Sequence, residues 1–215
     1  MADSRRGGKR WRPIQAIVVA TAGGGVILSA VYGYERAILK AREHGISSRG
    51  AAPASFLQVE APGVTRPPTV TAATTRLGDD EQIIGVEVAG RSRAYRLGAL
   101  RGRTNHVVND LIDGTPVSVA YCDISRCVRV YTDPEIDVPL DVRVGGLYVV
   151  DGGEMVLKVD GRYYFQRSGH AVELGTGPGS IPYRRIEPIL TTWGEWVRRH
   201  PTTDVYEGRA TATTP

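Results

Sequence analysis

The segment His106–Tyr131 reads HVVNDLIDGTPVSVAYCDISRCVRVY and alternates between apolar and polar residues along much of its length. A period of two residues is typical of β-strands, because successive side chains point to opposite faces of a sheet. Asp113-Gly114 interrupts the pattern with a dipeptide that favours a tight hairpin turn, and the loop Asp123–Arg126 interrupts it again. The segment therefore predicts three consecutive antiparallel strands, His106–Ile112, Pro116–Cys122 and Cys127–Tyr131.

The same period continues on both sides of this segment. Ile83–Val88 and Arg93–Arg96 predict a hairpin with its turn at Ala89–Ser92. Glycine pairs and an Asp-Gly dipeptide punctuate the chain further on, where we expect strands at 138–144, 147–150, 154–159, 162–167 and 171–174.

One helix is predicted near the C-terminus. Thr192-Trp193-Gly194-Glu195 forms a capping box at its start, and Pro201 stops it after His200. Trp193 and Trp196 lie three residues apart on one helical face, and we expect that face to pack on the sheet. The fold class predicted is α+β and β-rich, made mainly of antiparallel hairpins with short peripheral helices and preceded by one transmembrane helix.

Composition and charge narrow the function classes. The chain has 215 residues, of which 41% are apolar and 23% charged, as in ordinary globular proteins. The formal net charge of +4 resides within residues 1–12, and the rest of the chain carries equal numbers of acidic and basic side chains. A nucleic-acid-binding domain needs a basic face, so we expect no nucleic-acid partner.

The N-terminal region predicts a membrane anchor. Pro13–Tyr34 contains no charged residue, and as a helix it would extend about 33 Å, enough to cross a bilayer core of about 30 Å. Trp11 and Tyr32 suit the two interfaces. The basic cluster before the span predicts that residues 1–12 are cytoplasmic and that everything after Tyr34 is extracytoplasmic. We thus expect a single-pass protein of the cell membrane, with the membrane as a partner.

Two other interpretations of this span remain open. A cleaved signal peptide would use Ala20-Thr21-Ala22 as its processing site. A buried core helix would be weakened by Gly23–Gly25. If the span is an anchor, the spacing of Gly25, Ser29 and Gly33 permits close helix packing and hence a homodimer. An envelope protein is a further candidate partner.

The organisation of the whole chain follows from these patterns. We expect a cytoplasmic basic segment at 1–12, the anchor at 13–34, a juxtamembrane helix at 35–45, a linker at 46–69, the β-rich extracytoplasmic domain at 70–208 and a tail at 209–215.

Cys122 and Cys127 are the candidate chemical residues. If each cysteine ends its strand, the two face each other across a hairpin with Cα atoms about 4.5–5.5 Å apart, inside the range for a disulfide. An extracytoplasmic location favours such a bond. The sequence leaves four alternatives open: a structural disulfide, a redox-active pair, a metal site with His106 or Asp123, and two buried free thiols.

Four more residues are candidates for binding next to the cysteines: His106, Asn109, Asp123 and Arg129. If the pair is redox-active, one sulfur should be partly exposed, with Arg126 or Arg129 near enough to favour the thiolate. Arg129 follows Cys127 by two residues and shares its strand face, whereas Arg126 lies in the loop. Two cysteines are too few for a four-thiolate zinc site, and no phosphate loop or His-Glu-x-x-His motif occurs. We therefore assign no metal and no cofactor.

A series of short motifs runs along the chain from about Val70 to Tyr206. In order they are Asp79-Asp80-Glu81 before Ile83-Ile84-Gly85-Val86, Arg93-Ala94-Tyr95, Val108-Asn109-Asp110, Gly114-x-Pro116-Val117, Tyr121-Cys122, Gln166-x-x-Gly169-x-Ala171 and Thr192-Trp193-Gly194-Glu195-Trp196 ending in His200-Pro201. With these motifs in this order, the chain resembles the domain-of-unknown-function family 3179, a bacterial and archaeal group.

The resemblance implies a chemistry for the cysteines. Members of the family commonly show Tyr-Cys-Pro-x-Cys, and some are described as selenoproteins at a cysteine position, which implies thiol or selenol chemistry or soft-metal ligation. This chain departs from the pattern, because Asp123 replaces the proline, the second cysteine lies at Cys127, and Asn105 occupies the position of the usual histidine.

We therefore expect a thiol-based role at Cys122 and Cys127, either redox exchange or metal handling. The competing hypothesis is a non-enzymatic structural or binding domain of the cell envelope, in which the cysteines only form a structural disulfide.

Overall fold

The computed structural model describes residues 56–102, 104–149, 152–172 and 178–208. All of them belong to the compact unit Ser48–Pro215. The segments predicted as basic N-terminus, anchor, juxtamembrane helix and tail lie outside the described residues. Within the described ranges, no helix is both long enough and apolar enough to cross a membrane.

Three mostly antiparallel sheets build the domain, which confirms the predicted β-rich fold. We name each sheet after a central strand. The β7 sheet has the order β12-β8-β7-β6-β2, with strands Arg184–Ile186, Cys127–Thr132, Thr115–Cys122, Val107–Ile112 and Val64–Thr65. The β5 sheet has the order β13-β4-β5-β14-β3, with strands Ile189–Thr192, Gln82–Val88, Arg91–Arg96, Asp204–Tyr206 and Val70–Thr71. The β10 sheet has the order β1-β9-β10-β11, with strands Phe56–Leu57, Arg143–Tyr148, Glu154–Val159 and Arg162–Phe165.

The predicted three-strand segment is confirmed as β6, β7 and β8. Asp113 and Gly114 both have positive φ, 50° and 81°, which a two-residue hairpin turn of this type requires. The β4–β5 hairpin turns in the same way at Ala89 and Gly90, with φ of 49° and 74°. These turns match the right-handed twist of the strands they join, so local chemistry suffices to set both hairpins.

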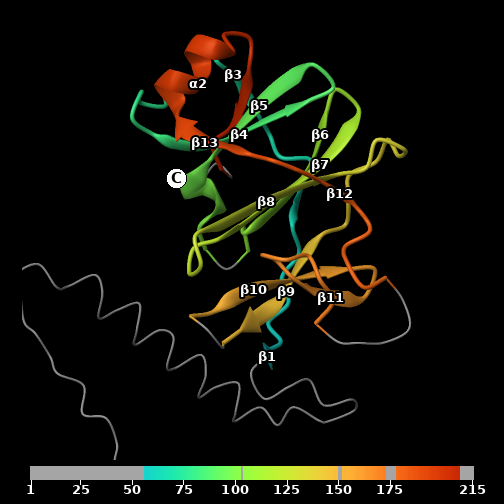
Figure 1. Ribbon diagram of the computed structural model, residues 1–215. Helices are drawn as coiled ribbons and strands as arrows, with labels where there is room; N and C mark the ends of the chain where they lie inside the picture. Colours follow the sequence, from blue (N-terminus) through green and yellow to red (C-terminus); the bar gives the residue numbers. More distant parts are fainter. Residues whose placement is uncertain (1–55, 103, 150–151, 173–177, 209–215) are drawn as a thin grey trace, which may run out of the picture. The chain divides into compact units, whose positions relative to one another are not determined.

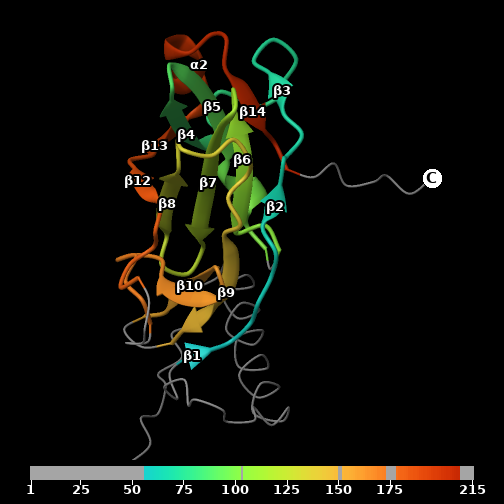
Figure 2. The ribbon, with the colours of Figure 1, turned by 90° about the vertical axis from the view of Figure 1, so that its right-hand side faces the viewer.

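The β7 sheet lies between the other two sheets, with α2 (Trp193–Arg199) at one end of the domain and β1 at the other (Figures 1 and 2). Strand β7 is consequently buried on both faces. Val119 and Tyr121 belong to the hydrophobic cluster that also includes Tyr95 of β5. Ala120 and Cys122 belong to a second cluster with Leu157 of β10. Strand alternation therefore directs the Cys122 side chain toward the β10 sheet.

Helix α2 covers the outer face of the β5 sheet, as expected from its tryptophans. The Thr192 hydroxyl accepts from the Glu195 amide at 3.4 Å, while the Glu195 carboxylate accepts from the Thr191 hydroxyl. Trp193 and Trp196 are both buried. Trp196 packs directly over Gly85, where an added Cβ would lie 2.3 Å from the indole ring. The predicted packing of this helical face on the sheet is confirmed.

Two short strands occur in the stretch expected to be a linker. β1 pairs with β9, and β2 runs parallel to β6, with Val64 opposite Val108. Phe56 and Val64 are buried. The described fold therefore begins before residue 70, because these residues bury apolar side chains against strands that are distant in the sequence.

The expected break at Gly145-Gly146 is wrong. Both glycines lie inside β9, which runs through the gap between the predicted strands 138–144 and 147–150. Gly146 has φ of 153°, and an added Cβ there would lie 2.2 Å from the carbonyl oxygen of Leu57. The glycine permits β1 to approach β9 closely, a role that local sequence does not distinguish from a turn.

Candidate functional site

Cys122 and Cys127 lie directly opposite each other at the end of a hairpin. Cys122 is the last residue of β7, Cys127 is the first residue of β8, and the two are register partners. Cys122 is buried and Cys127 is partly exposed. The predicted placement of the cysteines at the ends of adjacent antiparallel strands is therefore confirmed.

Both cysteines are free thiols, so the predicted disulfide is not present in this structure. The Tyr121 amide donates to the carbonyl oxygen of His106, directly before β6, at 2.8 Å. Because main-chain groups alternate in direction along a strand, those of Cys122 face β8, which makes Cys122 and Cys127 a hydrogen-bonded pair. Cα atoms in such a pair are about 5.5 Å apart, farther than in the non-hydrogen-bonded pairs of a ladder.

Each sulfur has a different polar neighbour. The Ser125 amide donates to the Cys122 sulfur at 3.5 Å, within the hairpin loop. The Cys127 thiol is oriented toward the carbonyl oxygen of Val128, with 3.8 Å between sulfur and oxygen. The two thiols thus interact with the main chain of their own hairpin.

The surroundings of Cys127 favour its protonated form. Burial raises the pKa of the Cys127 thiol, and the charge of Glu154 raises it further. The charges of Arg129 and Arg167 lower the pKa, but the net shift is upward. Arg129 lies near the thiol, as its position on the strand predicted, but its Nε and Nη2 both donate to the carbonyl oxygen of Arg167, at 3.0 and 2.8 Å. Its effect on the pKa is outweighed by burial.

Gln166 completes the site and was missed as a candidate by sequence reasoning. Its side chain is fully buried, and its Nε2 donates to the carbonyl oxygens of Ala120 and Cys127, at 3.0 and 3.1 Å. The available signal was the Gln166-x-x-Gly169-x-Ala171 motif, whose glutamine lies within the segment 162–167 predicted as a strand. A polar side chain at such a position is buried only with partners.

Two polar atoms beside the thiols have no partner among the described residues. They are Oε1 of Gln166 and the hydroxyl of Ser125. Buried side-chain oxygens without a protein donor are uncommon in folded proteins.

The other predicted binding residues lie at different distances from the thiols. The His106 Nδ1 is 3.0 Å from the carbonyl oxygen of Tyr121, the neighbour of Cys122. Asp123 is exposed in the hairpin loop. Asn109 is register partner of Ser118, which precedes Cys122 by four residues and thus by about 13 Å along the strand. Its amide donates to the carbonyl oxygen of Val142 at 2.9 Å and accepts from the Ser118 hydroxyl at 2.8 Å, so it serves the fold rather than the cysteines.

No group of three or more His, Cys, Asp or Glu side chains that could hold a metal ion occurs in the described part of the chain. A metal at the cysteines would find no third His, Cys, Asp or Glu side chain among the described residues.

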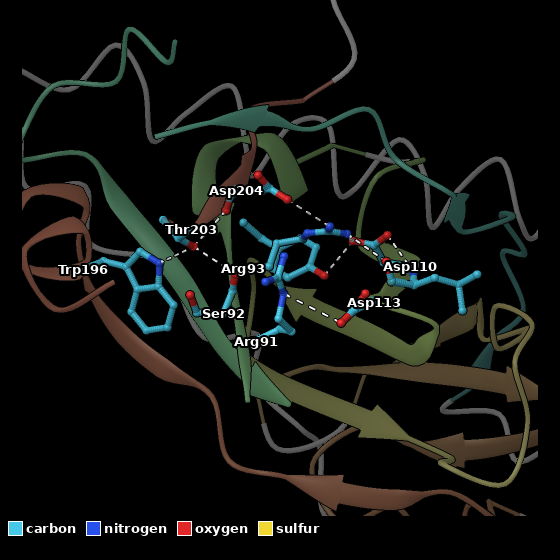
Figure 3. A network of polar contacts seen from close by, with 10 residues as sticks. Arg91, Ser92, Arg93, Asp110, Asp113, Trp196, Thr203 and Asp204 are labelled. Carbon is cyan, nitrogen blue, oxygen red and sulfur yellow. Dashed lines mark hydrogen bonds and ion pairs between the residues drawn. The ribbon is translucent and has the colours of Figure 1, made fainter. Parts of the chain in front are cut away.

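A buried polar network lies between the β5 and β7 sheets, away from the cysteines. Asp110 accepts from Arg93 and from the Tyr95 hydroxyl with the same oxygen, each at 2.8 Å. Arg93 also reaches Asp204 at 3.3 Å (Figure 3). Burial raises the pKa of Tyr95, and the charge of Asp110 raises it further, so the phenol remains a donor. The network joins β5, β6 and β14, the strands that carry the Arg93-Ala94-Tyr95 and Val108-Asn109-Asp110 motifs.

A polar cleft of about 220 Å³ lies beside this network. Arg91, Arg93, Asp113 and Asp204 supply its charged lining, with two side chains of each sign. The charges balance, and Arg93 is already neutralised by two carboxylates. The cleft therefore carries no clear preference for an anion or a cation.

Comparison with known proteins gives one match. No curated protein and no solved structure matches the chain. The family described as "Protein of unknown function (DUF3179)" matches residues 60–214, which includes the whole hairpin, Gln166 and the polar network. The chain belongs to the DUF3179 family.

Proposed function

We propose that this domain is a dithiol module in which Cys122 and Cys127 exchange electrons with external disulfides. The observation that carries the proposal is the register of β7 and β8, which pairs the two cysteines while both thiols are free. Paired Cα atoms about 5.5 Å apart lie within the separation found across disulfides. A bond could thus close without refolding of the hairpin.

The exchange starts at Cys127, which is the more exposed of the two thiols. Its thiolate attacks an external disulfide, R–S–S–R, forming a mixed disulfide and releasing one R–S⁻. The Cys122 thiolate then attacks the Cys127 sulfur and releases the second R–S⁻. Two protein thiols become one disulfide, and the external disulfide receives two electrons and two protons as two R–SH molecules.

The protonation of Cys127 sets the rate of this exchange. The thiolate is the nucleophile, and burial raises the pKa of the Cys127 thiol. The domain therefore exchanges slowly at neutral pH, as suits a redox-responsive element better than a fast oxidoreductase.

The raised pKa of Cys127 also favours a second candidate function. A non-enzymatic envelope domain has no need of a reactive thiolate, and a raised pKa of Cys127 is what such a domain would show. Metal handling has less support, because a soft ion such as Cu(I) would find only two sulfurs among the described side chains.

The proposal includes an extracytoplasmic location, with residues 13–34 as the anchor. The uncharged span and the basic residues before it support this location. A disulfide formed there would persist, whereas cytoplasmic thiols are kept reduced.

A redox titration of the full-length chain tests the proposal. The protein, prepared from membranes, is equilibrated with glutathione buffers of graded ratio, quenched with a thiol-alkylating reagent and weighed by mass spectrometry. We expect two labels at the reducing end, none at the oxidising end and one two-electron transition between them. Cys122→Ser is the matched control, and it should form only a mixed disulfide with glutathione.

The alternatives give different titrations. A structural disulfide would stay unlabelled until the potential falls below about −300 mV. Two labels at every ratio would overturn the exchange proposal and leave the non-enzymatic domain.

A further inference from the structure

Gln166 connects both strands of the cysteine hairpin to a third segment of the chain. Its Nε2 donates to Ala120 on β7 and to Cys127 on β8. Its own main-chain amide donates to the carbonyl oxygen of Met155 on β10 at 3.0 Å. The next residue, Arg167, accepts two hydrogen bonds from Arg129 on β8. Gln166 is thus held by its main chain to the β10 sheet and by its side chain to the hairpin.

The orientation of the Gln166 amide follows from its partners. Both neighbouring main-chain groups are carbonyl oxygens, so the NH₂ group must face them, because a flipped amide would place oxygen against oxygen. Both N–H bonds of Nε2 are then used, one on each strand. Oε1 is left buried without a donor among the described residues. The amide nitrogen of Gln166 therefore makes two hydrogen bonds to the hairpin, while its amide oxygen has none from the described residues.

Formation of a disulfide would disturb the hydrogen bonds between Gln166 and the hairpin. The Cβ atoms of a hydrogen-bonded pair lie toward the upper end of about 4.5–5.5 Å, whereas a disulfide holds them about 3.8 Å apart. The main chains of the two cysteines must therefore approach each other for the bond to form, and that of Cys127 is one of the two. The carbonyl oxygen of Cys127 is the one that Gln166 holds at 3.1 Å.

We propose that Gln166 is a positioning residue that stabilises the dithiol form of the Cys122–Cys127 pair. The inference rests on the exchange proposed above and names what regulates it. Loss of one buried hydrogen bond corresponds to roughly a tenfold change in an equilibrium constant. Removing the Gln166 donors should therefore shift the equilibrium with glutathione toward the disulfide by about tenfold, which equals about 30 mV for a two-electron couple.

The test compares three variants of the full-length chain in the glutathione titration. Gln166→Met keeps the volume of the side chain and removes both donors. Gln166→Glu keeps the shape, and its carboxyl, buried against two carbonyl oxygens, stays protonated and retains one donor. Thr132→Val is the matched control, because Thr132 donates to Pro116 at 2.7 Å across the same two strands at their other end. Thermal unfolding of each variant is recorded alongside.

We expect Gln166→Met to favour the disulfide by about tenfold, Gln166→Glu to shift the equilibrium less, and Thr132→Val to lose stability without a shift. Equal equilibria for wild type and Gln166→Met, or equal shifts in Gln166→Met and Thr132→Val, would overturn the inference while leaving the exchange proposal intact. If no variant forms a disulfide, both proposals are wrong. Should Gln166→Met fail to fold, the comparison of Gln166→Glu with Thr132→Val decides.

Discussion

The Gln166 side chain donates to the carbonyl oxygen of Cys127 across 39 residues of sequence, at 3.1 Å. This bond joins the end of the β10–β11 hairpin to the start of β8. It places a buried side-chain amide on the main chain of one of the two paired cysteines. Cys122 and Cys127 therefore belong to a three-segment arrangement, although they look like an isolated hairpin in the sequence.

Alkylation of Cys127 should depend on pH in a way that reports its burial. Because burial raises the pKa of the thiol, the rate in a Cys122→Ser background should still rise with pH above the range where an exposed cysteine has levelled off. Arg129→Gln removes a charge that lowers this pKa, so its profile should move to still higher pH. Stopped-flow labelling between neutral and alkaline pH provides the measurement, and a plateau at the ordinary thiol pKa would contradict the expected burial effect.

The free energy of unfolding should also depend on the protonation of the Cys127 thiol. A thiol whose pKa is raised in the folded state contributes stability below its unfolded pKa and loses that contribution as pH rises through the folded value. The free energy of unfolding of wild type should thus fall more than that of Cys127→Ser at alkaline pH.

Glu60 should make stability dependent on acid pH. Hydrogen bonds from Lys158, at 2.7 and 2.8 Å, and from Tyr163, at 2.6 Å, lower the pKa of Glu60 to about 2. A lowered pKa gives stability that is present above the unfolded value of 4.5 and is lost as pH falls toward 2. The urea midpoint of wild type should therefore decline between these values more than that of Glu60→Gln. Parallel curves would show that the carboxylate does not stabilise the fold.

Truncating Asp110 should destabilise the domain strongly. Asp110→Ala leaves the mostly buried Arg93 with one carboxylate partner, Asp204, beside the Leu111 carbonyl oxygen, and it removes the acceptor of Tyr95. Breaking a buried ion pair by removing one partner costs about 3–5 kcal/mol. Asp113→Asn is the control, because asparagine keeps the positive-φ turn while the change removes a carboxylate that is 71% exposed, and it should change stability by less than about 0.5 kcal/mol. Chemical unfolding measures both, and similar values for the two variants would exclude a stabilising role of the network.

Trp196 should act as a core residue. Its side chain is fully buried over Gly85, and its Nε1 donates to the Thr203 hydroxyl at 3.1 Å. Trp196→Ala should lower the free energy of unfolding by about 3–5 kcal/mol. Leu190→Ala, at a side chain 59% exposed, should have little effect. An alanine variant of Trp196 that melts like the parent would show that the indole is not part of the core.

The proposed topology is open to a direct test in cells. A reporter that is active only outside the cytoplasm, fused after Pro215, should be active if residues 13–34 span the membrane with 1–12 inside. Replacing the basic residues of 1–12 by neutral ones should reduce that activity, because positive charge sets the orientation. Activity of a cytoplasm-specific reporter at the same site would overturn the location and the argument for an oxidising compartment.

Sequence alone was sufficient for the features that neighbouring residues decide. The alternation over 106–131, the Asp113-Gly114 turn and the facing positions of Cys122 and Cys127 were all predictable, because turn chemistry and strand period act over a few residues. The Thr192 cap and the buried face of Trp193 and Trp196 were predictable for the same reason.

Tertiary structure decided what depends on distant partners. Local sequence does not reveal that Gln166 would bind the cysteine hairpin, that β2 would join β6 in parallel, or that Gly146 permits the approach of β1. The sequence also indicated that the charge of Arg129 would favour the thiolate of a redox-active Cys127. In the structure, the effect of burial on the pKa of Cys127 exceeds the effect of Arg129, and the pKa is raised. Desolvation and long-range pairing depend on which surfaces meet after collapse, and a pattern of neighbouring residues does not contain that information.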